Sequence, residues 1–199
     1  MNIETLKNSI NGVDIYILDQ ILKDCYQPGA KILDAGCGNG RNLKWFYETG
    51  FEIHGTEIDL KRLQQCKDSY PQQKNNFIEA FVEQMPYESN SFDHLVCIAV
   101  LHFAHDLDHY FRMFNELIRI LKPQGSLLIR TASNIGIEND VQHLGDGIFK
   151  LPDGSTRFLL TLKILEKLEA DNRFEWKENI KTTIVHGQRA MTTLVLQKV

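Results

Sequence analysis

Three glycines alternate with other residues in the segment KILDAGCGNGRNL, at Gly36, Gly38 and Gly40. They follow a short apolar run and precede a stretch with helical spacing, so the pattern predicts a turn from a strand into a helix. Glycine lets the backbone turn tightly and approach a ligand, because no side chain intervenes. The helix behind the turn offers unpaired N–H groups. The segment therefore indicates a ligand-binding loop, although a tight connection without a ligand can use the same glycines.

Two carboxylates accompany this loop. Asp34 directly precedes the glycines, and Glu57 closes the next apolar run in FEIHGTEID. Parallel strands end at a common edge of a sheet, so Glu57 is expected beside the loop, where a carboxylate can accept both hydroxyl hydrogens of a ribose. The GxGxG spacing differs from the GxGxxG of dinucleotide enzymes. Together the residues predict an adenosine-type site, whereas singly Asp34 could cap a strand and Glu57 could be a surface acid.

Two histidines, His102 and His105, follow the fourth apolar run, at the edge where doubly wound folds bind ligands. His102 is a candidate general base because the pKa of imidazole is near neutral, and pocket lining is the alternative role. A histidine pair without a third separate ligand is weak support for a metal site, so no metal is expected.

Three further side chains, Tyr16, Arg130 and Arg157, are candidates for contact with the substrate. Arg130 and Arg157, together with Arg189, could converge on an anionic group, because a guanidinium binds a carboxylate through two parallel hydrogen bonds. Tyr16, on an expected helix before the first strand, could close the pocket. Structural ion pairing for the arginines and a core position for Tyr16 remain open alternatives.

Short apolar runs alternate with helical stretches along the chain, at residues 31–34, 52–55, 76–80, 95–99 and 126–131. This alternation predicts an α/β fold with a doubly wound, mostly parallel sheet and helices on both faces. Two later strand-like runs, 174–185 and 190–197, are joined by too few residues for a parallel crossover. They are expected to pair as an antiparallel C-terminal hairpin, which gives seven strands in all.

The chain of 199 residues contains no Pro/Gly-rich linker, so residues 1–199 are expected to form a single domain. Residues 1–29 are expected to form a helical cover over a ligand cleft. The polar, glycine-containing stretch within 132–160 is expected to be a lid-like insertion before the last helix, because loops of this length in compact domains are usually functional.

The net charge of −4 provides no general attraction to nucleic acid or to an anionic membrane, so neither is an expected partner. Four cysteines are scattered singly, which fits reduced thiols in the cytoplasm. The N-terminus mixes charges where a secretory signal would be apolar, and no apolar run could span a bilayer. The sequence therefore indicates a soluble cytoplasmic protein, and its oligomeric state stays open.

The motifs DAGCGNG, GTEID, EQMPYESNSFDHLV and LKPQG occur in an order that resembles the class I S-adenosylmethionine-dependent methyltransferases, over residues 31–131. The resemblance implies a Rossmann-like methyltransferase fold, S-adenosylmethionine as cofactor and methyl transfer to an acceptor. It places Asp34 and Gly36 near the methionine part of the cofactor and Glu57 at the ribose. It also implies Gly38, Gly40 and Ile58 as cofactor-binding residues, Phe81 and Val82 at the border of the adenine, and Ala99 beneath the sulfonium.

One position departs from the family's pattern. Many members carry a carboxylate where this chain has Phe81, so a ring contact, or Glu79 or Glu83, would have to serve the adenine. After the fourth run, Ala99 to His102 replace the polar residue, two prolines and aromatic residue of nucleic-acid amino methylases, which favours a small-molecule acceptor. An NAD(P)-dependent oxidoreductase and a non-catalytic S-adenosylmethionine-binding protein are the alternatives.

Overall fold

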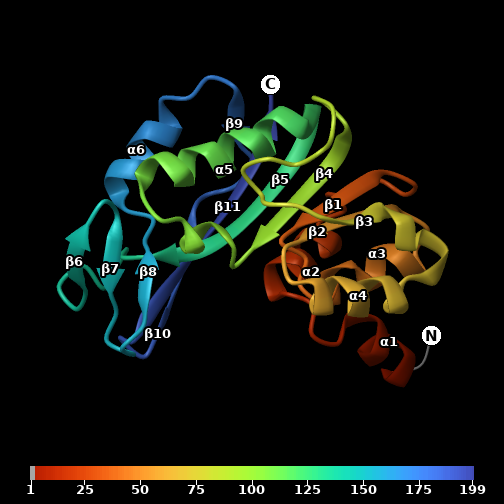
Figure 1. Ribbon diagram of the computed structural model, residues 1–199, viewed down its shortest axis with the longest axis horizontal. Helices are drawn as coiled ribbons and strands as arrows, with labels where there is room; N and C mark the ends of the chain where they lie inside the picture. The colour runs from red at the N-terminus through yellow and green to blue at the C-terminus, as the bar shows by residue number, and fades with distance from the viewer. Residues whose placement is uncertain (1–2) are drawn as a thin grey trace.

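The computed structural model describes residues 3–199 of the chain, and a sheet of eight strands runs through its centre (Figure 1). The strand order is β10-β11-β5-β4-β1-β2-β3, with β9 paired to β11. Strands β1 to β5 pair in parallel, whereas β11 is antiparallel to β5, β9 and β10. The strands of this sheet are β1 (Lys31–Ala35), β2 (Glu52–Glu57), β3 (Phe77–Glu79), β4 (Phe92–Ile98), β5 (Leu121–Ser133), β9 (Phe174–Trp176), β10 (Lys181–Val185) and β11 (Arg189–Lys198).

The expected doubly wound, mostly parallel sheet with its antiparallel C-terminal hairpin is confirmed. One strand expectation was wrong, because the run 174–185 forms two strands, β9 and β10, and raises the number of strands to eight. Between them, Glu178 accepts hydrogen bonds from Gln20 and Lys23, which lie far away in the sequence. These contacts hold the chain between the two strands against the end of the helix that contains Gln20.

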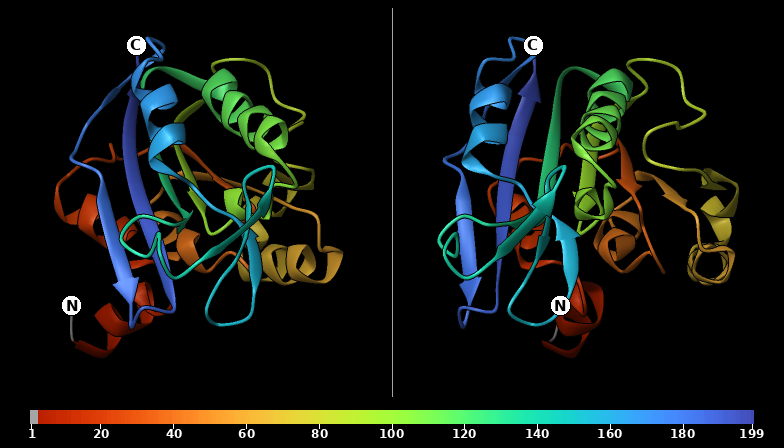
Figure 2. Two further views of the ribbon diagram at one scale, coloured as in Figure 1. Left: turned by 90° about the vertical axis from the view of Figure 1, so that its left-hand side faces the viewer. Right: turned by 60° about the vertical axis from the view of Figure 1, so that its left-hand side comes forward.

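Helices cover both faces of the sheet (Figure 2). They are α1 (Ile3–Ile10), α2 (Ile15–Leu22), α3 (Lys44–Glu48), α4 (Leu60–Ser69), α5 (Leu107–Ile120) and α6 (Leu162–Glu169), with short 3₁₀ helices η1 (Arg41–Leu43), η2 (Pro71–Asn76) and η3 (Leu101–Phe103). Successive strand residues point to opposite faces, so Leu33 packs with residues of α5 and α6, and its neighbour Ile32 packs with residues of α2, α3 and α4. The two apolar faces of the strands thus build two separate cores.

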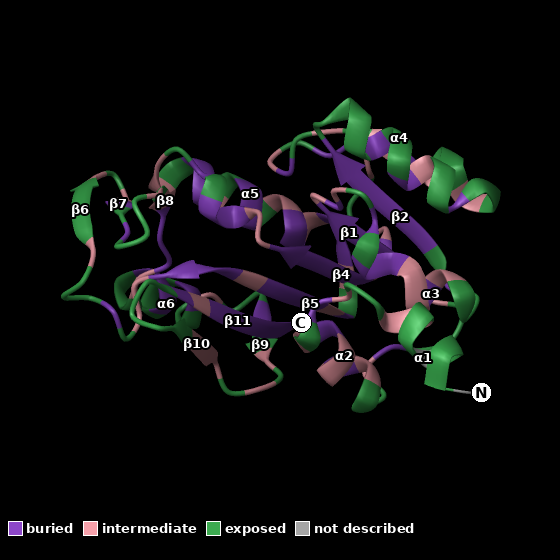
Figure 3. Ribbon diagram, turned by 90° about the horizontal axis from the view of Figure 1, so that it is seen from below, coloured by how far each residue is buried: buried purple, intermediate pink, exposed green. Residues whose placement is uncertain are grey.

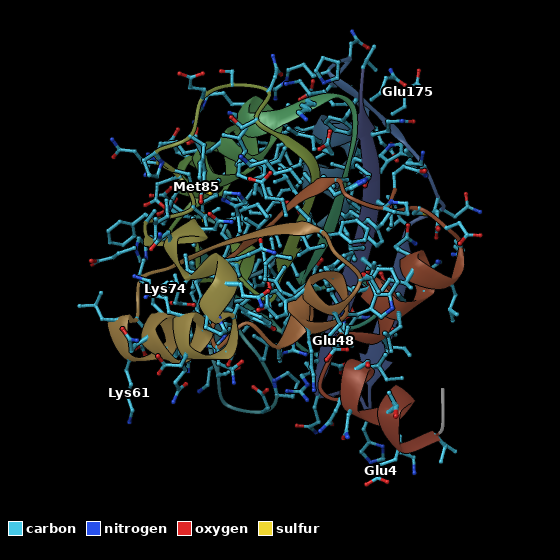
Figure 4. All side chains as sticks on the ribbon, turned by 90° about the vertical axis from the view of Figure 1, so that its right-hand side faces the viewer. Glu4, Glu48, Lys61, Lys74, Met85 and Glu175 are labelled. Carbon is cyan, nitrogen blue, oxygen red and sulfur yellow. The ribbon has the colours of Figure 1, made fainter. Side chains whose placement is uncertain are left out.

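The helices that border the carboxyl edge of the sheet begin at side-chain caps. The Asp59 carboxylate accepts from the first backbone N–H groups of α4, and Asp106 caps α5 in the same way. The inner side of α4 is buried at Leu63 and Cys66, and its outer side is exposed (Figure 3). Lys61 on α4 projects away from the molecule (Figure 4). Both helix starts are therefore fixed next to the ends of β2 and β4.

The expected helical cover at residues 1–29 contains α1 and α2, with residues 1–2 outside the described part of the chain. Helix α2 begins at its cap Asp14 and ends at Leu22, well before Pro28 and Gly29. Ile17 is fully buried in the core that α2 shares with α3 and α4. This helix is therefore anchored on one face of the sheet.

The segment expected as a lid-like insertion, 132–160, contains a second antiparallel sheet, β6 (Gln142–Gly145), β7 (Ile148–Lys150) and β8 (Thr156–Phe158). Phe158 at the end of β8 is buried and stacks on Tyr110 of α5 with ring centroids 5.0 Å apart. Leu159 and Leu160 are also fully buried. The small sheet is thereby attached to the start of α5, next to η3.

Candidate active site

A cavity of about 930 Å³ opens at the carboxyl edge of the parallel strands. Its walls come from the glycine loop after β1, the end of β2 with the start of α4, the segment after β3, and the residues after β4 with the start of α5. A cavity at this edge is the usual ligand site of a doubly wound sheet. The predicted site residues among its lining are Gly36, Gly38, Glu57, Ile58, Phe81, Val82, Ala99 and His102.

The backbone of the glycine loop is exposed to this cavity at Gly38. A Cβ built on Gly38 would meet no atom within 4 Å, so the space beside its backbone is open. At Gly36 the reason for glycine is different, because a Cβ would lie 2.5 Å from Cγ2 of Val100 and the φ angle is +75°. Gly36 thus permits close packing, and Gly38 presents bare backbone to the cavity.

Glu57 binds the loop directly. Its Oε2 accepts the N–H of Gly38 at an N···O distance of 2.8 Å. Its Oε1 accepts the N–H groups of Ile58 and Asp59 at 2.9 and 3.0 Å. The carboxylate therefore holds the glycine loop against the end of β2, and loop and acid face the same cavity.

Gly40 lies away from the cavity lining. It is buried with φ at +80°, and a Cβ there would lie 2.6 Å from Sγ of Cys66 and 2.7 Å from Cε2 of Tyr70. We expect Gly40→Ala to lower the free energy of unfolding by ~2 kcal/mol, through backbone strain and overpacking. Gly38→Ala, at φ +57° in open space, should cost only ~1 kcal/mol. Urea denaturation measures both, and equal losses would contradict the packing role of Gly40.

Asp34 is fully buried beneath the loop and does not line the cavity. Its Oδ2 lies 3.5 Å from Nδ2 of Asn42, and its buried Oδ1 has no hydrogen-bond partner among the described residues. Burial raises the pKa of Asp34 from 3.8 to about 7, against the opposing effects of Asn42 and the charge of Arg41. A buried carboxylate with an unused acceptor is suited to a nearby cation.

The far wall of the cavity is formed after β3 and β4. Phe81 is 61% exposed and Val82 is buried, so an aromatic ring stands at the rim where the family's pattern has a carboxylate. Glu83 lines the cavity and lies 3.2 Å from Nε2 of His109, whereas Glu79 is exposed and is not part of the lining. Ala99 adopts φ +61°, a left-handed conformation that costs energy for a residue with a Cβ.

Comparison with known proteins identifies the fold and domain. The methyltransferase domain family matches residues 33–129. A malonyl-[acyl-carrier protein] O-methyltransferase of Salmonella typhimurium is 30% identical over 102 residues, which are 51% of this chain and 39% of the relative. These similarities support a relationship to the class I S-adenosylmethionine-dependent methyltransferases. A probable tRNA methyltransferase 9B of Mus musculus is 27% identical over 113 residues, 55% of this chain and 23% of the relative.

The matches thus span less than half the length of these two curated methyltransferases. A crystal structure of a SAM-dependent methyltransferase from Methanosarcina mazei has the same fold, with a TM-score of 0.73 and 21% identity, over 90% of this chain and 97% of that one. S-adenosylmethionine is the cofactor of this family. The relatives include proteins named for a small-molecule acceptor and others named for tRNA.

Two observations indicate that the residues of the cavity and the glycine loop fit S-adenosylmethionine. The open space beside Gly38 leaves room for a ligand against bare backbone, next to an acid that already lies on the loop. The unpartnered Oδ1 of Asp34 is a buried carboxyl oxygen, and a cation beside it would favour the ionised form that suits an ammonium group. Among residues 3–199, no cluster of three or more His, Cys, Asp or Glu side chains could hold a metal ion.

His102 lines the cavity, and its hydrogen bond to the backbone indicates which of its ring nitrogens carries the proton. Its Nδ1 accepts the backbone N–H of Ala132 at 3.3 Å. A neutral imidazole whose Nδ1 accepts carries its proton on Nε2, so Nε2–H is a donor. Burial, and second the charge of Arg157, lower the pKa of His102 to about 4. This geometry suits hydrogen-bond donation to a bound group better than proton abstraction, and the role of general base stays a prediction.

None of the three residues predicted to contact the substrate belongs to the cavity lining. Arg130 forms an ion pair with Asp14 at 2.7 Å and lies over the ring of Tyr16, 5.2 Å from its centroid. The hydroxyl of Tyr16 is 2.6 Å from Oγ1 of Thr183. Arg157 instead lies over Phe103, a cavity residue, at 5.4 Å. Arg130 reaches the cavity lining only through its backbone carbonyl, which accepts the N–H of Ala99 at 2.7 Å. Among the three side chains, the guanidinium of Arg157 is the one that contacts a lining residue.

Several cavity residues were not anticipated from the sequence. Arg41 lines the cavity, donates to the carbonyl of Gly12 and directly follows the last glycine, so its position in GNGRN was an available signal. Asn42 lines the cavity and contacts Asp34. Phe103 and His109 belong to the lining only because η3 and α5 return toward the sheet edge. No local pattern marks those two positions.

No helix within residues 3–199 combines the length and the apolar character that a bilayer crossing requires.

Proposed function

We propose that this methyltransferase binds S-adenosylmethionine in the cavity and transfers its methyl group to a small-molecule acceptor. The observation that carries the proposal is the contact between Gly38 and Glu57 on the cavity wall. Bare backbone beside a carboxylate is suited to an adenosyl group, whose ribose hydroxyls are donors. In this proposal Glu57 binds the ribose, Ile58, Phe81 and Val82 border the adenine, and Ala99 lies beneath the sulfonium.

S-adenosylmethionine supplies a methyl group attached to a sulfonium, which is already a good leaving group. The protein's residues therefore mainly have to orient the reactants and exclude water, and such positioning can account for ~7–11 kcal/mol of the barrier. The glycine loop and Glu57 fix one side of the cavity, and the strained backbone at Ala99 fixes the other. Asp34 and Gly36 act at the methionine end, with Gly40 supporting the loop from beneath.

The acceptor's proton does not need a strongly basic side chain. With its proton on Nε2, His102 would donate a hydrogen bond to an acceptor or orient it. An acceptor that arrives as a thiolate or similar anion needs no base, and an amine can lose its proton after transfer. We therefore assign His102 an orienting role in the proposed reaction.

A small molecule is favoured over tRNA as the acceptor. The residues after β4, Ala99 to His102, lack the polar residue and prolines that would bind a planar amino group, and the net charge of −4 opposes nucleic-acid binding. The tRNA methyltransferases among the relatives make tRNA the comparison to run. A cytoplasmic location, expected from the scattered cysteines, belongs to the same proposal.

Calorimetric titration tests the cofactor assignment. S-adenosylmethionine and S-adenosylhomocysteine are expected to bind at one site per chain, and NAD is expected to bind much more weakly. Preferential binding of NAD would contradict the proposal in favour of an oxidoreductase. Formation of S-adenosylhomocysteine in the presence of an acceptor then separates an enzyme from a protein that only binds the cofactor. We expect this product with small acceptors and not with tRNA.

A further inference from the structure

The arginines divide into two groups by their partners. Five form ion pairs with carboxylates, Arg62, Arg112, Arg119, Arg130 and Arg173. Within residues 3–199, Arg41, Arg157 and Arg189 have no carboxylate within 4.0 Å. Arg41 lines the cavity, and Arg157 lies over Phe103 at its rim. Two of these three positive charges thus lie at the proposed active site.

The acidic residues that line the cavity each have partners other than Arg157. Glu57 accepts three backbone N–H groups, and Asp59 caps α4 and lies 3.6 Å from Arg62. Glu83 lies beside His109 at 3.2 Å. Among the described residues, none of these carboxylates forms an ion pair with Arg157. The guanidinium of Arg157 is therefore free of an ion pair with the cavity carboxylates, and Asp153 is within electrostatic reach of Arg157 and Arg189.

Arg157 is held in a position from which it can bind a ligand. Strand β8, which carries it, is fixed by the stacking of Phe158 on Tyr110. One guanidinium nitrogen, Nη1, donates to the carbonyl of Thr156 at 2.7 Å. The central carbon of the guanidinium lies over the ring of Phe103, which is 57% exposed, at 5.4 Å from its centroid. A guanidinium has five N–H donors, so most of them are left for a ligand. Phe103 also offers an apolar surface to the ligand's carbon skeleton.

We propose that the acceptor of this methyltransferase is an organic anion, whose carboxylate or phosphate group is bound by Arg157 beside Phe103, with Nε2–H of His102 as a second donor. A guanidinium binds either group through parallel hydrogen bonds, and such charge-assisted bonds are the stronger kind. The proposal rests on the proposed methyl transfer, because it names the substrate class of the same cavity. Arg157 then determines acceptor specificity and leaves cofactor binding unaffected.

Matched probe pairs test this proposal on the full chain saturated with S-adenosylhomocysteine. In mandelamide and mercaptoacetamide a neutral amide of similar shape replaces the carboxylate of mandelate and mercaptoacetate. Phosphoethanolamine and ethanolamine form the phosphate pair. We expect the anionic member of the carboxylate or the phosphate pairs to bind ~10-fold or more tightly than its neutral partner, and the better pair identifies the anionic group.

Three variants test whether Arg157 binds the anionic group or only supports the folded structure. Arg157→Ala should abolish the preference for the anion, and Arg157→Lys should retain part of it, because lysine keeps the charge without the planar donors. Arg189→Ala is the matched control, since Arg189 also lacks a carboxylate partner but lies on β11. Cofactor affinity should be unchanged in all three. In nuclear magnetic resonance, the pKa of His102 should rise in Arg157→Ala, because one of the two influences that lower it is gone.

The outcomes distinguish this proposal from the proposed function. Failure of S-adenosylhomocysteine to bind the wild-type chain would contradict the methyltransferase proposal itself. Normal cofactor binding with no preference for any anionic probe, or a preference that survives in Arg157→Ala, would overturn the assignment of Arg157 alone. If Arg157→Ala does not fold, loss of affinity in the folded Arg157→Lys variant, with cofactor binding retained, carries the same test.

Discussion

Replacing Glu57 with alanine is expected to weaken S-adenosylmethionine binding by ~3 kcal/mol, roughly 100-fold. The carboxylate accepts the N–H groups of Gly38, Ile58 and Asp59, so its loss leaves three backbone donors without their partner. It also removes the acceptor proposed for the ribose hydroxyls. Both effects act on the same loop, which is why this substitution is expected to be among the most damaging to cofactor binding.

Isothermal titration calorimetry measures the loss, and Glu79→Ala provides the matched control. Glu79 pairs with Glu57 across β2 and β3 but is exposed and does not line the cavity. Its replacement should leave affinity unchanged. Glu57→Gln should fall between the two, because one amide oxygen replaces two carboxylate oxygens. Wild-type affinity in Glu57→Ala would show that Glu57 does not bind the ribose.

Replacing Asp34 with asparagine is expected to have opposite effects on stability and on binding. The free protein should gain ~2 kcal/mol in free energy of unfolding at pH 8, because a buried carboxylate no longer has to be ionised there. Affinity for S-adenosylmethionine should fall ~10-fold or more, because an amide offers no charge to the ammonium group proposed to lie near Oδ1. Asn42→Ala is the control, because it removes the neighbour that contacts Oδ2 but keeps the carboxylate.

The direction in which the free energy of unfolding changes with pH follows from the raised pKa of Asp34. The pKa of Asp34 is raised from 3.8 to about 7 in the folded chain. Between these values the folded state keeps a proton that the unfolded state has lost, so this group lowers stability progressively as pH rises from about 4 to 7. Denaturation of wild type and Asp34→Asn across this range should show a difference that grows with pH. A constant difference would contradict the buried, proton-retaining state of Asp34.

Most of the fold could be predicted because the hydrophobic patterns of its strands and helices are local in the sequence. Each parallel strand is a short apolar run, and the stripe of Tyr110, Phe114 and Leu117 on α5 is buried as its spacing indicates. The C-terminal hairpin followed from the short link around Gly187. The split of 174–185 into β9 and β10 could not be foreseen, because it depends on contacts of Glu178 with Gln20 and Lys23, more than 150 positions away.

The part of the candidate site that could be predicted is the part where a sequence motif lies at the end of a parallel strand. Gly38 and Glu57 lie in contact because β1 and β2 are adjacent and parallel, which the alternation of strands and helices implies. Arg130 and Arg157 could not be separated, since both are single arginines in unremarkable sequence. Only the tertiary structure shows that Asp14 neutralises Arg130 while Arg157 has no carboxylate partner among the described residues. Charge compensation depends on neighbours that sequence spacing does not encode.

The position of β11 has a consequence for the order in which the molecule can form. Residues 189–198 pair along most of β5 and also bind β9 and β10, so they complete one half of the sheet. During synthesis, β5 emerges more than 50 residues before the strand that covers its edge. Until then the apolar Leu127 and Leu128 belong to an unpaired strand edge, which is prone to pairing between molecules. Early interruption of translation would therefore release an aggregation-prone fragment that already contains the residues lining the cavity, the last of which is Met113.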